Sequence, residues 1–360
     1  MTLLLTLINC AEKASNIARV CRSNEKLLSL LVQEKSGAEK NQRFDQDFKT
    51  LADVLIQETI KHEVGTQFPD MREHILGEES PNFTNTNGQK VSIAVGATES
   101  ETAACLEEVL GGFEGAAAAL ATEVHAEVAY KGEELGDIPA QLDQLDYSNL
   151  GIWIDPIDAT AEYIAGDSIF SSFPGITSAG LDCVTVLIGV YKRDSGVPII
   201  GIVAQPFAKK LQENSYQTAL YWGVCLPTLK AHNCFFKERE GSQRIGIFSS
   251  SEQANILQSI RDLNYELAFS AGAGHKALKV ICQDADVYLL SKGSTFKWDT
   301  CAPQAILRAL GGDIYDYVES INQQQAVPIN YISKEDKCNT NGLIAVRNPN
   351  LVKELLEQLA

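Results

Sequence analysis

The N-terminal part of the chain carries apolar residues at helical spacing. They recur every three or four positions from Leu3 to about Gln33 and from Phe44 to about Glu63, which predicts two amphipathic helices separated by the polar segment "EKSGAEKNQR". On the second helix, Thr50, Asp53 and Gln57 form a polar row beside the apolar stripe. The pattern therefore predicts a helical start to the chain with polar side chains bordering one buried face.

Short apolar runs predict strands through the middle of the chain. The first is "HILGEES", which is followed by a segment rich in Asn, Thr and Gly that we expect to be loop. The next are Lys90 to Val95 and Leu150 to Ile154, separated by two Ala- and Glu-rich helical stretches. The runs "CVTVLIGVY" and "VPIIGIVAQPF" flank the turn residues of "KRDSG" and predict a hairpin, with a further strand at "ALYWGVCL".

From Arg244 onward, strands and helices alternate. The order is strand "RIGIF", helix from Glu252, strand "ELAF", helix from His275, strand "VYLL" and helix from about Thr300. We therefore expect an α/β protein with an α+β N-terminal subdomain at 1–240 and an α/β C-terminal subdomain at 241–360, which meet near Gly241.

Composition and charge narrow the classes of protein to which the chain can belong. A hydrophobic content of 45% in 360 residues allows a large buried core. The chain has 47 acidic and 30 basic residues, and this balance argues against binding to nucleic acid or to an anionic membrane surface. No run approaches the roughly 20 apolar residues that span a bilayer, and the opening residues lack the basic region of a signal peptide. The scattered cysteines contain no Cys-x-x-Cys pair and are typical of reduced thiols, so we expect a cytoplasmic protein.

Acidic residues occupy the ends of predicted strands or the starts of predicted helices at four places: Asp53, Glu78 with Glu79, Asp155 with Asp158, and Asp299. A single carboxylate at such a place is explained by a helix cap or a solvated turn, and Asp299 or Thr300 would cap the helix that contains Pro303. The pair at Asp155 and Asp158 differs, because it follows the apolar strand "LGIWI" and a cap needs only one carboxylate. This motif therefore indicates a functional site.

The motif "DPID" requires a compensating cation. Gathered carboxylates raise their own pKa values unless a cation lies among them, and ligands made of oxygen alone favour a hard cation such as Mg²⁺. Pro156 fixes the backbone between Asp155 and Ile157, so that both carboxylates and the Ile157 carbonyl can face one place, and two ions could share Asp155. Thr160 adds a hydroxyl, and the N–H groups of Ala159 and Thr160 at a helix start can receive an anion. Metal ions beside an anion site indicate phosphate chemistry.

A second anion site is predicted at "GAGHKA", Gly272 to Ala277. The spacing fits the dinucleotide pattern G-x-G-x-x-A, but the acidic residue that this pattern requires about 20 positions later is missing. The glycines would instead let the backbone approach an anion at a helix start, with Lys276 reaching a second phosphate; a structural turn with a solvated lysine is the alternative. In "SSSE", either Ser251 donates to the substrate or Ser249 and Glu252 form a capping box.

Four motifs follow one another along the chain: Asp53 in the second helix, Gly77-Glu78-Glu79, Asp155-Pro156-Ile157-Asp158-Ala159-Thr160, and Trp298-Asp299. In this order they resemble the Mg²⁺-dependent, lithium-sensitive phosphatases, the family that includes inositol monophosphatase and fructose-1,6-bisphosphatase. The likeness covers nearly the whole chain and is greatest to the branch that removes the 1-phosphate of inositol 1,4-bisphosphate and inositol 1,3,4-trisphosphate. A 3'(2'),5'-bisphosphate nucleotidase is the alternative, because "WDTCAP" also resembles that branch.

The resemblance implies a layered α-β-α-β-α sandwich with two or three Mg²⁺ ions at its centre and inhibition by Li⁺. Glu78, Asp155 and the Ile157 carbonyl would ligate the first ion. Asp155, Asp158 and Asp299 would ligate the second ion. Asp53 and Glu79 would hold a third, weaker ion or its water shell.

The same resemblance assigns catalysis to Asp53, Glu78 and Thr160, because Thr160, hydrogen-bonded to Asp53, would position the attacking water. The substrate contacts that it implies are Asp158, Ala159, Thr160, Ser251, Gly272, Ala273, Lys276 and Ser294. The chain departs from the family at Ala159, where relatives carry Gly or Ser, and at His275 and Gln304, positions that bear on substrate preference.

We therefore expect an enzyme, a phosphoric monoester hydrolase that acts on a phosphorylated small molecule. We expect no nucleic-acid or membrane partner, and a monomer or a weak homodimer. The alternative from another class is a phosphoinositol-binding module that has lost catalysis. All the acidic positions remain carboxylates, which favours the enzyme.

Overall fold

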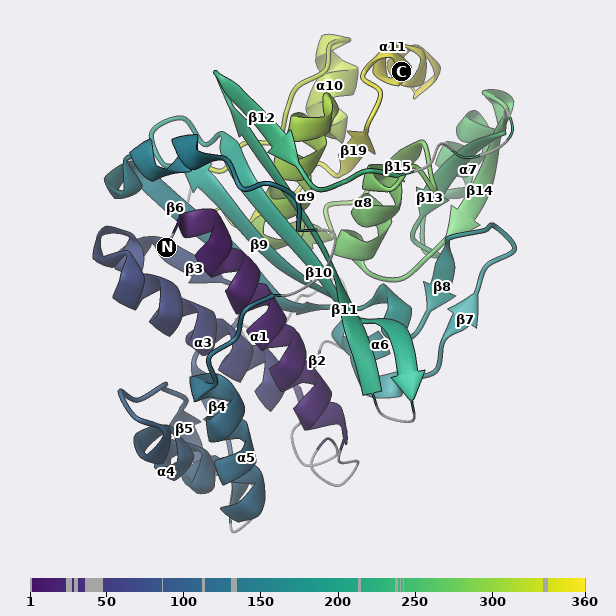
Figure 1. The fold of residues 1–360 in the computed structure, drawn as a ribbon. Coiled ribbons are helices and arrows are strands. Elements are labelled where there is room, and N and C mark those ends of the chain that lie inside the picture. Colours follow the sequence, from purple (N-terminus) through teal and green to yellow (C-terminus); the bar gives the residue numbers. More distant parts are fainter. Residues whose placement is uncertain are drawn as a thin grey trace.

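Helices and sheets alternate in layers through the molecule (Figure 1). The computed structural model describes residues 2–23, 28, 32–35, 48–85, 87–111, 114–130, 135–212, 215–236, 239, 241, 243–332 and 336–359. Helices cover the outer face of one sheet, two helices separate it from a second sheet, and further helices cover the outer face of that second sheet. The α/β class and the α-β-α-β-α order predicted from the sequence are confirmed.

The first sheet lies in the N-terminal part of the chain. Its strands are β3 (Ile75–Gly77), β6 (Leu150–Asp158), β9 (Thr185–Lys192), β10 (Pro198–Gln212), β11 (Ser215–Leu226) and β12 (Leu229–His232). They follow the order β12-β11-β10-β9-β6-β3, and every neighbouring pair is antiparallel except β3 and β6, which run parallel. The hairpin predicted around "KRDSG" is therefore confirmed as β9 and β10.

Helices α1 (Leu3–Ser23) and α3 (Leu51–Gln67) cover the outer face of this sheet (Figure 1). Helix α1 packs on β9, β10 and β11, whereas α3 packs on β3 and β6. The two Ala- and Glu-rich stretches form α4 (Glu99–Leu110) and α5 (Glu114–His125), as predicted, and α5 packs on α1. Fully buried apolar side chains such as Leu7, Ile17 and Ile188 join these helices to the sheet.

The second sheet is formed by β13 (Arg244–Phe248), β14 (Tyr265–Phe269), β15 (Val287–Leu290), β17 (Asp313–Asp316) and β19 (Leu343–Val346). Their order is β14-β13-β15-β19-β17, with β19 antiparallel to both of its neighbours. Helices α7 (Ala254–Asp262), α10 (Tyr317–Gln323) and α11 (Asn350–Leu359) pack on its outer side. Helices α8 (Ala273–Ile281) and α9 (Lys297–Leu310) contact strands of both sheets. The alternation predicted from Arg244 to α9 is confirmed, and the elements after α9 were not predicted.

Three glycines let α9 lie directly on the first sheet. Gly189 of β9, Gly201 of β10 and Gly223 of β11 face one another across the strands. A Cβ atom at Gly201 would come within 2.0 Å of the Ala302 carbonyl oxygen, and one at Gly223 within 2.8 Å of the Ile306 Cα atom. Because any side chain here would push the helix away, this glycine seam determines how closely α9 approaches the sheet.

Four predicted boundaries are wrong. The first helix ends at Ser23, and Gln33 lies in β1 (Val32–Glu34). The second helix begins at Leu51, because β2 (Phe48–Thr50) pairs with β1, while Phe44 lies outside the described residues. The predicted loop contains β4 (Asn82–Thr84), which pairs with β5 (Lys90–Ser92), the strand predicted to begin at Lys90, and β6 continues through the motif to Asp158. The last three of these depend on strand pairing, which periodicity does not reveal.

The remaining short elements are α6 (Thr160–Ala165), β7 (Ile169–Phe170), β8 (Thr177–Ala179), β16 (Thr295–Phe296), β18 (Cys338–Asn339) and the 3₁₀ helices η2 (Pro69–His74), η3 (Ala140–Gln144), η4 (Tyr147–Asn149) and η5 (Leu181–Cys183). Within the described ranges, no helix has the length and apolar character needed to cross a bilayer.

The cysteines are free thiols. The two sheets lie on either side of the predicted boundary near Gly241 in sequence, and the division into two subdomains stays a prediction.

Candidate active site

A cavity of about 570 Å³ opens where β6, α6, β13, α8 and α9 meet. The predicted site residues that line it are Glu78, Asp155, Ile157, Asp158, Ala159, Thr160, Ser251, Gly272, Ala273, Lys276, Ser294 and Asp299. Asp53 and Glu79 do not line the cavity; both are buried behind it. Residues from both halves of the chain therefore meet at one hollow, as the order of motifs predicts.

Two parallel strands bring the first carboxylates together. In the pairing of β3 with β6, Gly77 lies opposite Ile154, so Glu78 and Asp155 follow at the same edge of the sheet. The Glu78 N–H donates to the Ile154 carbonyl at 3.1 Å, which extends the pairing by one residue. Because the carboxyl ends of parallel strands lie side by side, residues far apart in the sequence become neighbours here.

A β-bulge turns the carboxylates of Asp155 and Asp158 to one side. Asp155 lies opposite Leu187 and Asp158 opposite Thr185, so three steps on β6 match two on β9. In a regular strand, residues three positions apart face opposite sides of the sheet. The extra residue of the bulge shifts this alternation by one position. The bulge and the proline together therefore place both carboxylates on the same side of the sheet.

Asp155, Asp158 and Asp299 form what we call the aspartate cluster. One carboxylate oxygen from each lies within 4.8 Å of the others, and all three residues are buried. Asp299 comes from the first turn of α9, where its other role is to accept the Phe296 N–H at 2.5 Å. Because the glycine seam lets α9 lie close to the first sheet, the Asp299 carboxylate comes near the end of β6.

The aspartate cluster fits a hard divalent cation. Burial, followed by repulsion from Glu78, Asp158 and Asp299, raises the pKa of Asp155 well above its usual range. Burial also raises the pKa of Asp299, with Asp158 adding to the rise. The buried Asp155 Oδ1 has no hydrogen-bond partner among the described residues. An orphaned carboxylate oxygen among other carboxylates is the donor set that Mg²⁺ prefers.

Asp158 also joins the cluster to the start of α8. Its carboxylate accepts N–H groups from Gly274 at 2.8 Å and from Ala273 at 3.2 Å, and the Thr185 hydroxyl at 3.2 Å. Gly272 precedes them with a φ of 75°, and a Cβ there would lie 2.9 Å from the Asp158 Oδ2 atom. The N–H of Ala273, which we predicted to contact substrate, is therefore directed to Asp158.

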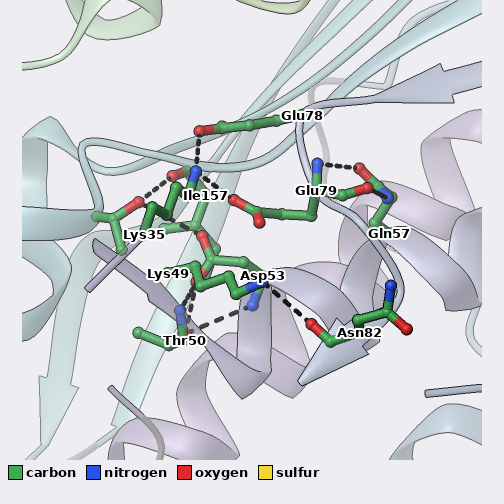
Figure 2. A network of polar contacts seen from close by, with 10 residues as sticks. Lys35, Lys49, Thr50, Asp53, Gln57, Glu78, Glu79, Asn82 and Ile157 are labelled. Atoms are coloured by element: carbon green, nitrogen blue, oxygen red, sulfur yellow. Dashed lines mark hydrogen bonds and ion pairs between the residues drawn. The ribbon is translucent and has the colours of Figure 1, made fainter. Parts of the chain in front are cut away.

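Glu78, Glu79 and Asp53 form a second group, the glutamate cluster (Figure 2). Asp53, in the first turn of α3, accepts the Thr50 N–H at 2.7 Å and the Thr50 hydroxyl at 2.5 Å. The Thr160 hydroxyl lies 3.4 Å from Asp53 and 3.0 Å from the Ile157 carbonyl. The Thr160–Asp53 contact that the resemblance implies is thus present in the structure.

Gln57 fixes the backbone that carries the glutamates (Figure 2). Its side-chain amide donates to the Glu79 carbonyl at 2.6 Å and accepts the Glu79 N–H at 2.9 Å. A Cβ at Gly77 would lie 2.0 Å from the Gln57 Oε1 atom, so a glycine is needed beside this amide pair. In the sequence, Gln57 lies on the row of Asp53, but nothing there indicates its role, since its partner is a backbone segment distant in sequence.

Lys35 joins the glutamate cluster, although no sequence pattern predicts a role for it. Its Nζ atom lies 2.5 Å from a Glu78 oxygen and 2.5 Å from a Glu79 oxygen, and its side chain is buried. Burial raises the pKa of Glu79 to about 8, with Glu78 adding to the rise and Lys35 opposing it. Burial likewise raises the pKa of Asp53 to about 6. The segment around Lys35 is polar and without periodicity, so no sequence signal marked it.

Helix α6 begins directly after the motif. Ala159 precedes it in the left-handed region, with a φ of 67° and a ψ of 49°. An alanine side chain makes this conformation costly, whereas glycine adopts it freely. Arg22 of α1 donates to the Tyr163 and Ile164 carbonyls at the other end of α6, at 2.5 Å and 3.2 Å. The short helix that carries Thr160 is therefore held at both ends.

The far side of the cavity presents a buried lysine and serines. The Lys276 Nζ atom donates to the Gly272 carbonyl at 2.6 Å and to the Ser270 carbonyl at 3.2 Å, and burial lowers its pKa to about 8. The alternative of a solvated lysine is therefore wrong, because the Lys276 side chain is buried. The capping box considered for "SSSE" is also wrong: α7 begins only at Ala254, and Glu252 accepts the Ser291 N–H instead.

The fold and these two acidic clusters define a class of protein. The model of the inositol monophosphatase family matches residues 85–359, and the chain belongs to this family. Curated relatives named inositol polyphosphate 1-phosphatase match nearly the full length: the Bos taurus enzyme is 38% identical and the Mus musculus enzyme 39% identical, each over 99% of this chain and 96% of the relative. The 3'(2'),5'-bisphosphate nucleotidase 1 of Rattus norvegicus is 29% identical over 58% of this chain and 60% of its own length.

Solved structures share the fold at low sequence identity. The extragenic suppressor protein suhB of Bartonella henselae superposes with a TM-score of 0.55 at 14% identity, covering 98% of this chain and 96% of that protein. The inositol monophosphatase of Thermotoga maritima superposes with a TM-score of 0.53 at 13% identity, over 98% and 96% of the two chains. A staphylococcal inositol monophosphatase soaked in LiCl, described as an inhibitory complex, gives a TM-score of 0.51 at 14% identity, over 93% and 87%.

Proposed function

We propose that this protein is a Mg²⁺-dependent phosphatase that removes the 1-phosphate of inositol 1,4-bisphosphate and inositol 1,3,4-trisphosphate. Full-length similarity to inositol polyphosphate 1-phosphatases supports the substrate class. The observation that carries the chemistry is the aspartate cluster, in which three buried carboxylates face one another at the cavity. Such a cluster is stable in the folded protein only when cations or protons compensate it.

The geometry supports the proposed set of metal ligands. Asp155 lies between Glu78 at the edge of β3 and Asp158 with Asp299 in the cluster, so it is placed to be shared between two ions. Bound Mg²⁺ would neutralise charge on the phosphoryl oxygens and lower the pKa of the attacking water. The number of ions stays a prediction, as does a third, weaker ion at Asp53 and Glu79.

Thr160 and Asp53 form the candidate proton path. A Thr160 hydroxyl that donates to Asp53 leaves its lone pairs free to accept a hydrogen bond from water, so that a proton taken from the water would be matched by the hydroxyl proton passing to the Asp53 carboxylate. Thr50 holds the other oxygen of Asp53 in place, so the carboxylate cannot turn away from Thr160. These residues would orient the water for in-line attack on phosphorus without a covalent enzyme intermediate.

The rest of the substrate would lie toward α8 and α9. Lys276 brings a positive charge to a cavity whose other charges are mostly carboxylates, and Ser251 and Ser294 line the same wall. A phosphate of the inositol ring that is not hydrolysed would pair with this lysine. Inhibition by Li⁺ is part of the proposal, and the LiCl-soaked staphylococcal structure of the same fold supports it. A cytoplasmic location and a monomer or weak homodimer stay predictions.

A substrate panel tests the proposal. The purified chain would be assayed with inositol 1,4-bisphosphate, inositol 1-phosphate, fructose 1,6-bisphosphate and a nucleoside 3',5'-bisphosphate, each with Mg²⁺, with Mg²⁺ plus Li⁺, and with a chelator. We expect the highest kcat/KM for inositol 1,4-bisphosphate, a loss of turnover in the chelator, and inhibition by Li⁺.

The other outcomes of the panel are equally informative. Fastest release from the nucleotide would favour the nucleotidase alternative, to which the relatives give weaker support because the rat enzyme matches only 58% of this chain. Binding of inositol phosphates without turnover of any ester in Mg²⁺ would favour the binding module.

A further inference from the structure

Lys35 lies where a cation is expected. It follows β1 directly, and its Nζ atom is 2.5 Å from both Glu78 and Glu79 (Figure 2). Only 4% of its side chain is exposed, so the ammonium group has little access to water. A buried ammonium group is stable only when carboxylates or carbonyls surround it. The glutamates supply that compensation, and the lysine in turn compensates them.

The charge on Lys35 is retained despite burial. Two carboxylates lie in direct contact with its Nζ atom, and this arrangement favours the positively charged ammonium form.

A divalent cation on the same oxygens would repel this ammonium group. Mg²⁺ binds carboxylate oxygens at about 2.1 Å, and Lys35 already contacts one oxygen of each glutamate. An ion sharing those oxygens would lie within about 5 Å of the Nζ atom, where like charges in a buried site repel strongly. The two cations would compete for the same negative charge.

The attachment of Lys35 allows such a competition. Among the described residues, the three-residue strand β1 pairs its backbone only with β2, in a two-stranded sheet apart from the two large sheets. The Gln33 side-chain amide of β1 also accepts the Thr84 N–H at 3.3 Å and donates to the Thr84 carbonyl. The glutamates, however, are held by β3, which pairs with β6, and by the Gln57 amide. When a metal ion arrives, the partner that can withdraw is therefore the lysine side chain, whose charge sits on a flexible four-carbon stem, while the glutamates keep their places.

We propose that Lys35 is a built-in counter-cation that excludes a divalent ion from Glu78 and Glu79 until that ion displaces it. The consequence is a threshold: this part of the site fills only at Mg²⁺ concentrations high enough to expel the lysine, whereas the aspartate cluster, without such a lysine contact among the described residues, fills first. The proposal rests on the proposed magnesium site, but not on which phosphate ester is hydrolysed.

Calorimetric titration of the full chain with Mg²⁺ alone tests the competition. Replacing the lysine by an uncharged side chain, Lys35→Met, should tighten the weakest class of Mg²⁺ sites by at least about tenfold, while Lys35→Arg should remain near the wild type. Lys13→Met is the matched control, because Lys13 is also buried and paired 2.5 Å from a glutamate, Glu63, outside the site. Unchanged or weaker binding in Lys35→Met would overturn the proposal.

A second measurement uses the wild-type protein and does not depend on whether Lys35→Met folds. Amine-reactive labelling followed by peptide mass spectrometry should show Lys35 protected in a chelator and modified at least about tenfold faster in saturating Mg²⁺, with Lys13 unchanged. If Lys35 were labelled equally in both conditions while Mg²⁺ still bound, the proposed displacement of Lys35 would be overturned and the proposed function would not. Failure of the wild-type chain to bind Mg²⁺ at all would overturn the proposed function as well, so the two failures are distinguishable.

Discussion

The two acidic clusters solve the same electrostatic problem in different ways. In the aspartate cluster, the compensation among the described residues comes from the nearby charge of Lys276 and from the N–H and hydroxyl groups that donate to Asp158, and no lysine contacts a carboxylate directly. Asp155 keeps an oxygen without a partner among these residues. In the glutamate cluster, Lys35 lies between the carboxylates. A lysine charge is part of the chain, whereas a metal ion must bind from solution. The stability of the aspartate cluster should therefore depend on Mg²⁺ far more than that of the glutamate cluster.

This contrast also separates structure from function. The glutamate cluster is anchored by Asp53 and Gln57 of α3 and by Thr50, which caps that helix, and so it is integral to the packing of α3. The aspartate cluster instead joins elements that are distant in sequence, namely β6, α8 and α9. Substitutions in the glutamate cluster should therefore disturb stability, and substitutions in the aspartate cluster should chiefly disturb turnover.

The largest expected effect comes from Asp155→Asn. We expect kcat to fall by about 1,000-fold, because the variant loses the carboxylate that two ions would share. Its melting temperature in a chelator should not fall, since a buried like-charge repulsion is relieved. Glu58→Gln is the control: Glu58 lies on the helix of Asp53 but pairs with Lys61 at 2.7 Å outside the cavity. An active Asp155→Asn enzyme would remove the aspartate cluster from the mechanism.

Lys276→Met should raise KM by about tenfold, with a smaller change in kcat, because it removes the positive charge on the substrate side. Burial lowers the pKa of Lys276 to about 8, so the wild-type KM should rise between pH 7 and 9 as the ammonium group loses its proton, and the variant should lack this rise. Lys279→Met, on the same helix but paired with Asp284, is the matched control. A pH-independent wild-type KM would contradict the assignment.

The stability of the glutamate cluster should depend on pH when Mg²⁺ is absent. The pKa of Glu79 is raised to about 8 and that of Asp53 to about 6, both above the ordinary carboxylate values of about 4. The folded state therefore binds more protons than the unfolded state, and the free energy of unfolding falls as pH rises from about 4 to about 8. Melting curves in a chelator should show this fall, and Glu79→Gln should flatten it. A rising melting temperature over this range would contradict the assignment.

The smallest expected effect is that of Ala159→Gly. Ala159 adopts a left-handed conformation, which glycine adopts without strain, so the variant should gain about 0.5 kcal/mol in unfolding free energy after the entropy of glycine in the unfolded state is subtracted. Urea melts would measure the gain, and turnover should be retained because the backbone N–H remains. Ala161→Gly, a helical position of α6, should instead lose about 1 kcal/mol.

Much of the site was predictable because carboxylates after apolar strands are costly. The cost of burying Asp155 and Asp158 was visible in the run "LGIWIDPID", and the order of the four motifs indicated the family before any fold was known. The bulge in β6 was not predictable, because it depends on the register of β9. Nor was the N–H contact of Ala273 with Asp158, which depends on how α8 lies against β6.

By itself, the sequence determined the kinds of ligand available, the alternating α/β order from Arg244 to α9 and the family, because side-chain type and apolar periodicity are properties of the chain alone. Only the tertiary structure decided which carboxylates meet. The pairing of β3 with β6, the bulge at Pro156 and the glycine seam beneath α9 set those distances. It also decided the place of Lys35, since a lysine in a polar segment acquires a role only from the charges that the fold brings beside it.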